Sequence, residues 1–125
     1  MSEHRLFDSN ILIDYLRDDA EAVDCVESNP SRLSISTIVE AELCAGAHDE
    51  DERRRIEIML GEFQVFPVTH PIAVLGGLFK RDYQPSHGTG LADALIAATA
   101  EVHEVRLVTL NEKHFPMLED IIIPY

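Results

Sequence analysis

Short runs of apolar residues alternate along the chain with longer segments in which apolar positions recur every three or four residues. Apolar runs of four to six residues are typical of buried strands, whereas a spacing of three or four is typical of helices. Strands are predicted at residues 5–7, 32–36, 63–68, 105–110 and 120–124. Helices are predicted at residues 10–18, 20–28, 36–47, 51–63, 71–83 and 91–103.

This alternation of strands with helices predicts the fold class. Strands joined through helices favour parallel pairing, with the helices packed on both faces of the sheet. The predicted strands are short and almost wholly apolar, as strands covered on both faces are. We therefore expect an α/β fold, in which functional groups lie beyond the carboxyl ends of the strands, where the strand order reverses.

Length and composition predict one globular domain, residues 1–125. The chain is 46% hydrophobic, and no segment approaches the roughly 18 to 20 apolar residues that span a membrane. The N-terminal residues MSEHR lack the pattern of a signal peptide, and the two cysteines form no disulfide framework or zinc motif. These features together predict a cytoplasmic protein.

The net charge of -13 is the most unusual property of the composition. Such a surface repels polyanions at long range, which argues against a nucleic-acid binder that relies on a basic surface. It is compatible with an enzyme that meets a phosphate through a bound cation, because the cation reverses the local charge.

The first predicted strand leads into the segment LFDSNILID, residues 6–14, where polar residues interrupt an aliphatic run. An unpaired carboxylate is costly to bury, so we expect the strand to end at Asp8. Aspartate, serine and asparagine all favour the position that caps a helix, and capping is the alternative role for Asp8. We expect Ser9 or Asn10 to cap the following helix and to leave Asp8 free at the sheet edge.

The segment STIVEAELCAG, residues 36–46, carries two glutamates on different helix faces, because two positions correspond to about 200° of rotation. Glu42 shares its face with a stripe of apolar and small residues that includes Ile38 and Gly46. Glu40 does not, and an exposed position suits it better. We therefore expect Glu42 to point toward the carboxyl edge of the sheet.

Further candidates lie near the end of the chain. Asp93 falls in the first turn of an alanine-rich helix, where the helix dipole favours negative charge, but close packing there would also require a partner for its carboxylate. Thr109 and Asn111 follow the fourth predicted strand, and turn formation is their alternative role. An asparagine can ligate a cation through its amide oxygen, although more weakly than a carboxylate.

Asp8, Glu42, Asp93 and Asn111 thus all fall at one predicted edge, and we predict that they are the catalytic residues. Carboxylates that lie close together repel unless a cation separates them. Oxygen ligands without cysteine or an HExxH spacing favour Mg²⁺ or Mn²⁺ over Zn²⁺, so Asp8, Glu42 and Asp93 are the predicted metal ligands. Hydrolysis of a phosphodiester by metal-activated water is typical of such a cluster.

Three segments of the chain resemble the PIN-domain ribonucleases, and specifically the VapC-type toxins of type II toxin–antitoxin pairs. They are LFDSNILIDYLR at 6–17, ISTIVEAELCAG at 35–46 and LADALIAATAEVHEVRLVTLNEKHF at 91–115. The resemblance carries the acidic residues of the family onto Asp8, Glu42 and Asp93, and it aligns Asn111 with a fourth acidic residue of many members. It implies a three-layer α/β/α sandwich with a five-stranded parallel sheet.

The resemblance also implies an endoribonuclease toxin that depends on Mg²⁺ or Mn²⁺, acts on RNA and forms a homodimer. It implies a small VapB-like antitoxin with a basic C-terminal segment, which suits the acidic chain. The RNA would be held by the metal and by a few local cations, such as Arg17, Lys80, Arg81 and Lys113. Because Asn111 is not acidic, the alternative is a catalytically weak PIN domain that acts as a binding module.

Two other families with a similar arrangement fit the sequence less well. A haloacid-dehalogenase-like phosphatase requires a second aspartate two residues after the first, where this chain has Asn10. A receiver-like phosphoacceptor domain requires an aspartate after a central strand and a lysine after the last one. The segments FQVFPVTH and DIIIPY provide neither residue.

Overall fold

The computed structural model describes residues 4–28 and 32–125. These residues form the strands β1 (His4–Phe7), β2 (Arg32–Ser36), β3 (Gln64–Phe66) and β4 (Arg106–Val108). They also form the helices α1 (Ser9–Leu16), α2 (Ala20–Glu27), α3 (Thr37–Ala45), α4 (Glu50–Leu60), α5 (His70–His87) and α6 (Leu91–His103). A short 3-10 helix, η1, follows at Glu112–His114.

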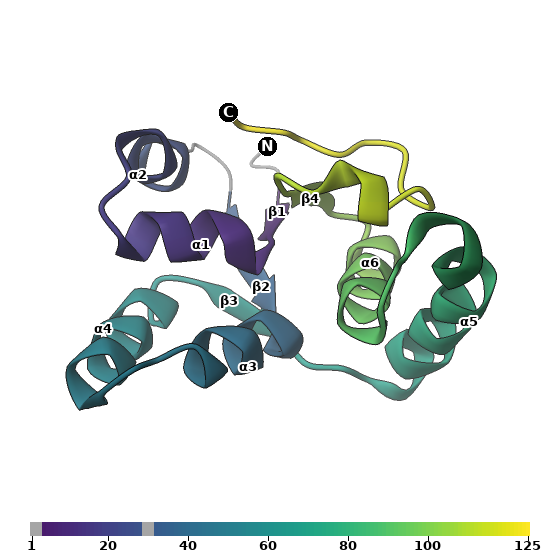
Figure 1. Cartoon of the computed structure of the whole chain (residues 1–125), viewed down its shortest axis with the longest axis horizontal. Coiled ribbons are helices and arrows are strands. Elements are labelled where there is room, and N and C mark those ends of the chain that lie inside the picture. The colour runs from purple at the N-terminus through teal and green to yellow at the C-terminus, as the bar shows by residue number, and fades with distance from the viewer. Residues whose placement is uncertain (1–3, 29–31) are drawn as a thin grey trace.

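The strands form one parallel sheet with the order β3-β2-β1-β4. Leu6 of β1 lies opposite Ser34 of β2, and Phe7 lies opposite Val108 of β4. Helices α1 to α4 lie on one side of the sheet, and α5 and α6 lie on the other (Figure 1). The predicted α/β fold with a parallel sheet is therefore confirmed.

The strand order reverses between β1 and β4. From β1 the chain adds β2 and then β3 on one side, and after α5 and α6 it returns to place β4 on the opposite side of β1. The crevice at such a reversal is where open α/β sheets bind their ligands. Asp8 directly follows β1 and Thr109 directly follows β4, so both residues lie at this point.

The prediction of a fifth strand at 120–124 is wrong, because this segment contributes only an isolated bridge between Val108 and Ile122. The Ile122 N–H donates to the Leu107 carbonyl at 2.8 Å, and the Thr109 N–H donates to the Ile122 carbonyl at 3.0 Å. Pro124 has no N–H with which to continue the ladder. The C-terminal segment therefore passes beside β4 as extended chain (Figure 1).

Helix α5 is longer than the predicted range 71–83, because it continues past Pro85 to His87. It ends at Gly88, whose φ of 69° lies in the left-handed region and whose N–H donates to the Gln84 carbonyl at 2.9 Å. A proline in the last turn removes only one of the final hydrogen bonds. Despite this length, no helix within 4–28 or 32–125 is apolar enough to cross a membrane.

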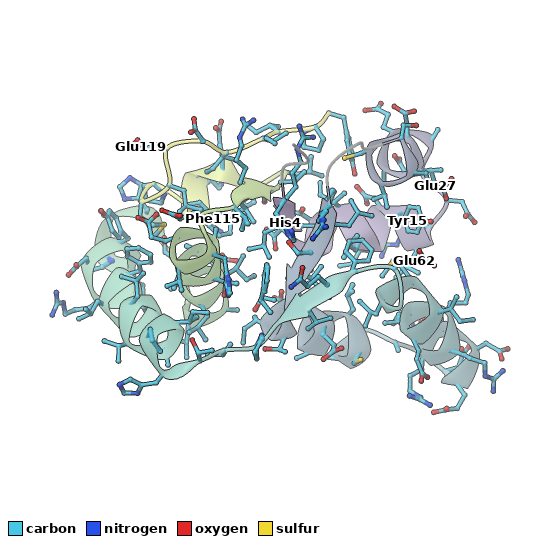
Figure 2. The ribbon with its side chains drawn as sticks, turned by 180° about the vertical axis from the view of Figure 1, so that it is seen from behind. His4, Tyr15, Glu27, Glu62, Phe115 and Glu119 are labelled. Carbon is cyan, nitrogen blue, oxygen red and sulfur yellow. The ribbon has the colours of Figure 1, made fainter. Side chains whose placement is uncertain are left out.

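The core lies on both sides of the sheet. The strand residues Leu6, Phe7 and Leu107 are at most 1% exposed. Figure 2 shows Phe115, which is fully buried, on the α6 side of the molecule, and Tyr15 beside Glu27 on the other side. The Tyr15 hydroxyl donates to Oε2 of Glu27 at 2.8 Å and so joins α1 to α2.

Helices α5 and α6 approach each other closely at Gly76. A Cβ atom at this position would lie 2.6 Å from Cδ2 and 3.2 Å from Cα of Leu95, so a larger residue would collide with α6. The alanine-rich surface of α6, which includes the fully buried Ala94 and Ala97, permits the tight packing that the sequence predicts. This packing fixes the helix whose first turn carries Asp93.

Candidate active site

Asp8 lies at the end of β1 and is almost completely buried, with 5% of its surface exposed. Its Oδ1 accepts a hydrogen bond from the Ser9 N–H at 2.8 Å, and its Oδ2 accepts one from the Thr109 hydroxyl at 2.7 Å. Burial raises the pKa of Asp8, and repulsion from Asp93 adds to this, whereas the two hydrogen bonds lower it. The net effect is a raised pKa, because the two hydrogen bonds do not fully offset the cost of burying the charged carboxylate.

Asp8 is itself the N-cap of α1, so the prediction that Ser9 or Asn10 would cap this helix is wrong. The capping residue must precede the first helical residue and keep an extended backbone. Because β1 ends at Phe7, Asp8 takes that position, with φ of -77° and ψ of 159°. Each carboxylate oxygen has two lone-pair sites, so Asp8 keeps acceptor capacity for a cation beside both hydrogen bonds.

Thr109 links the loops that follow β1 and β4. Its fully buried hydroxyl donates to Asp8 and accepts from the Asn10 amide at 3.3 Å and from the Asn111 N–H at 3.1 Å. The Leu110 N–H donates to Oδ1 of Asn10 at 3.4 Å. This orienting role was not predicted, and the signal in the sequence is the single hydroxyl that follows an apolar strand.

Glu42 contributes the second predicted carboxylate from α3. Partial burial of its carboxyl group and repulsion from Asp8 raise its pKa, and Asp93 adds to this effect. A hydrogen bond with the Ser9 side chain acts in the opposite direction. Glu42 is therefore within electrostatic reach of both other predicted carboxylates.

The expectation that an exposed position suits Glu40 better than Glu42 is wrong. The Glu42 residue is exposed as a whole, and Glu40 is half-buried. Val39 and Leu43 occupy the buried face of α3, which leaves Glu42 at the rim of the site rather than beneath it. The stripe of apolar and small residues therefore predicted which glutamate lies near Asp8. It did not predict how exposed that glutamate is.

Asp93 meets a histidine that was not among the predicted site residues. Nδ1 of His114 lies 3.1 Å from Oδ2 of Asp93 and 2.7 Å from the side-chain amide of Asn111. The side chains of Asp93 and His114 are 25% and 30% exposed. Asn111 and His114 are three residues apart across η1, a spacing at which side chains of a 3-10 helix lie above one another.

The structure therefore brings the predicted residues to one edge without gathering the carboxylates into a single coordination shell. In the described part of the chain, no three histidine, cysteine or acidic side chains are grouped so that they could hold a metal ion. Repulsion from Asp93 nevertheless raises the pKa of Asp8, and repulsion from both aspartates raises the pKa of Glu42. Their oxygen atoms are the ligand type that suits a hard divalent cation, which would relieve this repulsion.

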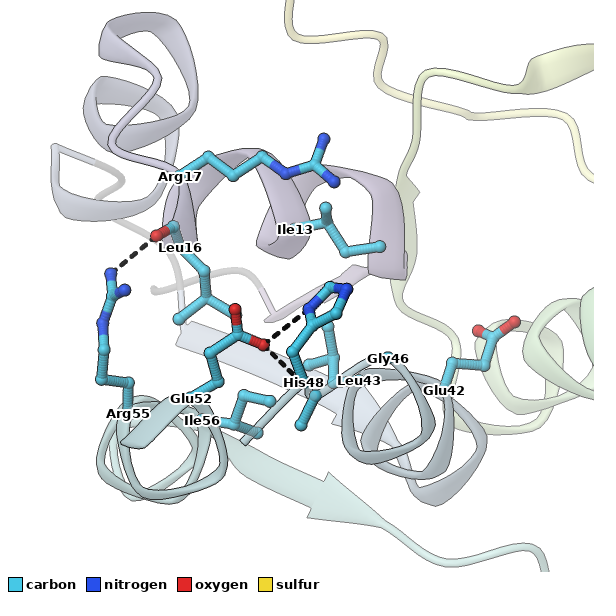
Figure 3. Close-up of a pocket in the computed structure, with 11 residues that line it drawn as sticks. Ile13, Leu16, Arg17, Glu42, Leu43, Gly46, His48, Glu52, Arg55 and Ile56 are labelled. Atoms are coloured by element: carbon cyan, nitrogen blue, oxygen red, sulfur yellow. Dashed lines mark hydrogen bonds and ion pairs between the residues drawn. The ribbon is translucent and has the colours of Figure 1, made fainter. Parts of the chain in front are cut away.

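A cavity of about 200 Å³ lies beside these residues, between α1, α3 and α4 (Figure 3). Glu42 lies at its rim, and the Glu42 carboxylate points away from the other lining residues. The Arg55 side chain donates to the Leu16 carbonyl at 2.6 Å. Arg17 also lines the cavity, and no described residue forms a hydrogen bond or ion pair with its guanidinium.

Comparison with known proteins gives consistent matches over nearly the whole chain. A family model described as the PIN domain matches residues 5–119. The chain is 42% identical over 123 residues to ribonuclease VapC10 of Mycobacterium tuberculosis, covering 96% of this chain and 92% of that protein. It is 39% identical over 125 residues to ribonuclease VapC19 of the same species, and this match covers 97% of this chain and 99% of that protein.

Solved structures also resemble this chain in fold. A chain of a toxin–antitoxin complex from Klebsiella pneumoniae superposes with a TM-score of 0.84 at 31% identity, covering 97% of this chain and 98% of that chain. A chain of DNA-bound VapBC from Salmonella typhimurium superposes with a TM-score of 0.78 at 26% identity, and this match covers 98% of this chain and 97% of that chain.

Proposed function

The chain belongs to the PIN-domain family, and we propose that it is a Mg²⁺- or Mn²⁺-dependent endoribonuclease toxin that a small antitoxin neutralises. The observation that carries this proposal is the proximity of Asp8, Glu42 and Asp93 at the reversal of strand order. The ribonuclease names of the relatives support the reaction. The toxin–antitoxin complexes among the similar structures support the partner.

In this proposal Asp8, Glu42 and Asp93 hold the metal. When bound by these residues, a divalent cation would supply a Lewis acid and would lower the pKa of a water molecule for attack on the phosphodiester. Thr109 orients Asp8 through its hydroxyl, so this carboxylate needs little rearrangement before binding. Glu42 lies at the exposed rim, where the entry of RNA can displace water from its carboxylate.

Recognition of RNA by so acidic a chain requires local cations. Lys80 donates to the Gln84 side chain at 2.7 Å, and Arg81 donates to Asp82 at 2.8 Å, so both are engaged on α5. Arg17 lines the same cavity as Glu42 and has no such contact with a described residue. We therefore propose Arg17 as the first cation to meet an RNA phosphate.

The same cavity supports the proposed binding of a basic C-terminal segment of a VapB-like antitoxin. Its lining combines apolar side chains, such as Ile13 and Ile56, with Glu42 and Glu52, and it also includes Arg17 and Arg55. The apolar side chains and the Glu42 carboxylate, which points away from the other lining residues, suit a segment that carries both apolar and basic residues. The net charge of -13 favours the approach of such a partner over long distances.

We also propose a homodimer. Val74 and Leu78 lie one turn apart on α5 and are 50% and 41% exposed. Their exposure gives α5 an apolar surface that a second copy can cover. Sedimentation velocity of the purified chain tests this assembly, and the replacement of both side chains by serine should favour the monomer.

Cleavage of structured RNA by the purified, antitoxin-free chain tests the enzyme proposal. We expect activity with Mg²⁺ or Mn²⁺, loss of activity with EDTA, and a loss exceeding about a hundredfold in Asp8→Asn and in Asp93→Asn. Asp82→Asn is the matched control, because Asp82 forms an exposed ion pair away from the site. Cleavage that persists in EDTA, or that both site substitutions leave intact, would refute the mechanism. A chain that binds RNA without cutting it would instead support the binding-module alternative.

The toxin role has a separate test. Expression of the wild-type chain should arrest growth, and the arrest should disappear in Asp8→Asn and on co-expression of a small neighbouring gene for a DNA-binding protein. Absence of such a gene would count against the antitoxin and leave the nuclease proposal standing.

A further inference from the structure

His114 brings a nitrogen atom into an otherwise oxygen-rich site. Its backbone is fixed on both sides, because its N–H donates to the Asn111 carbonyl at 3.2 Å and its carbonyl accepts from the Thr89 hydroxyl at 2.8 Å. Thr89 is fully buried. The ring therefore projects from an anchored position, with Nδ1 facing both Asp93 and Asn111.

The two contacts of Nδ1 make incompatible demands on one atom. The Asp93 carboxylate only accepts hydrogen bonds, so its contact at 3.1 Å requires a proton on Nδ1. The NH₂ group of Asn111 at 2.7 Å requires a lone pair on the same nitrogen. If the amide turns over, its oxygen faces this point as well, and three lone-pair donors then converge. Either a proton or a metal ion must lie among them.

We propose that Nδ1 of His114 is a nitrogen ligand of the metal site, with Asp93 and Asn111 as its oxygen-donating neighbours. This inference rests on the proposed metal dependence and adds a residue to the donor set of Asp8, Glu42 and Asp93. An imidazole favours first-row transition ions, whereas oxygen ligands alone suit Mg²⁺ equally well. The site should therefore prefer Mn²⁺ over Mg²⁺.

An orienting role for His114 leads to a different expectation. A histidine that only donates a hydrogen bond to Asp93 would position this carboxylate for any cation. Its removal would then weaken Mg²⁺ and Mn²⁺ binding by similar factors. The ratio of the two affinities, together with direct detection of a bound nitrogen, separates a ligand from a positioning residue.

The experiment measures metal binding to the full, antitoxin-free chain without reference to cleavage. Calorimetry gives the affinities for Mn²⁺ and Mg²⁺, and pulsed electron paramagnetic resonance of bound Mn²⁺ detects coupling to a ligand nitrogen. The variants are His114→Gln, His114→Asp and the control His70→Gln, which alters an exposed histidine at the start of α5. Thermal unfolding checks that each variant is folded, and ¹⁵N-labelled histidine in the wild-type chain tests the nitrogen without any substitution.

We expect nitrogen coupling in the wild-type chain and in His70→Gln, and its loss in both variants at 114. His114→Gln should lower Mn²⁺ affinity by about tenfold or more but Mg²⁺ affinity by less than about threefold. His114→Asp should bind Mg²⁺ at least as tightly as the wild-type chain, because it supplies a hard oxygen ligand.

The ligand role would be overturned if Mn²⁺ bound to the wild-type chain showed no nitrogen coupling. It would also be overturned if His114→Gln lowered the affinities for Mn²⁺ and Mg²⁺ by equal factors. A wild-type chain that binds neither ion and cleaves RNA in EDTA would refute the proposed function itself. The two failures are therefore distinguishable.

Discussion

The two sides of the candidate site are positioned by different kinds of interaction. On the side of β1 and β4, Asp8 is 5% exposed and both of its carboxylate oxygens accept hydrogen bonds. On the side of α5 and α6, the side chain of Asp93 is 25% exposed, and its helix is packed against α5 at Gly76. Hydrogen bonds fix the position of single atoms, whereas packing fixes a whole helix.

This difference determines where the site is sensitive to substitution. The loss of one hydroxyl at Thr109 should disturb the Asp8 side without moving the backbone. The stability of the Asp93 side should tolerate changes in polar atoms but not an increase in volume between α5 and α6, whereas its activity still requires the Asp93 carboxylate.

The largest effect is expected for Gly76→Val, which places a branched side chain where a Cβ atom alone would lie 2.6 Å from Leu95. Overpacking of this kind should lower the free energy of unfolding by about 3 kcal/mol. Gly77→Val is the matched control, because nothing lies within 4 Å of a Cβ atom there, and it should change the free energy of unfolding by less than about 1 kcal/mol. Urea denaturation measures both values. Equal losses would show that close approach at Gly76 does not position α6.

Thr109→Val should have the next largest effect, because it removes the hydroxyl that donates to the buried Asp8. We expect a loss of about 2 kcal/mol in stability and of about tenfold to a hundredfold in RNA cleavage. Thr99→Val is the control, since this buried hydroxyl donates to the Leu95 carbonyl within α6. Denaturation and cleavage assays on both variants test the comparison. Cleavage that falls equally in both would contradict a specific role for Thr109.

The smallest effect is the pH dependence of stability that arises from Asp8 and Glu42. Both pKa values are raised above the ordinary values of 3.8 and 4.5, mainly by burial, with repulsion from Asp93 added. Between the ordinary and the raised pKa, the folded state binds more protons than the unfolded state, so the contribution of these groups to stability grows as the pH falls.

In metal-free buffer, this contribution should increase as the pH falls from neutrality toward the ordinary values of 3.8 and 4.5, and this increase should be absent in a chain that carries Asp8→Asn and Glu42→Gln. Asp93 and His114 face the same site, so they stay unchanged in both chains. Thermal melting over the pH series measures the difference between the chains. Identical profiles would contradict the raised pKa values.

Much of the fold follows from local patterns in the sequence. The six helices lie where the apolar spacing predicts them, because each buries an apolar face against the sheet or against a neighbouring helix. The segment 120–124 is as apolar as a strand, but β4 spans only three residues and Pro124 ends the pairing, so a single bridge forms. Apolar composition reports that a segment is buried, not that its backbone is paired.

The site was predictable to the level of the element that carries each residue, but not to the level of contacts. Asp8 and Asp93 could be predicted as site residues, because Asp8 comes directly after a strand and Asp93 lies in the first turn of a helix. The bond from Thr109 to Asp8 joins residues 101 positions apart, and no local pattern encodes it. The contact of His114 with Asp93 likewise depends on how η1 packs against α6.

The backbone bridge at Ile122 has a consequence for synthesis of the protein. The Thr109 N–H is bound by the Ile122 carbonyl, and the Thr109 hydroxyl in turn orients Asp8, the earliest acidic residue of the site. A nascent chain that has already folded α1 to α4 still lacks both of these contacts. The contacts that orient Asp8 are therefore complete only after the segment around Ile122 has been synthesised, which makes the site one of the last parts of this domain to form.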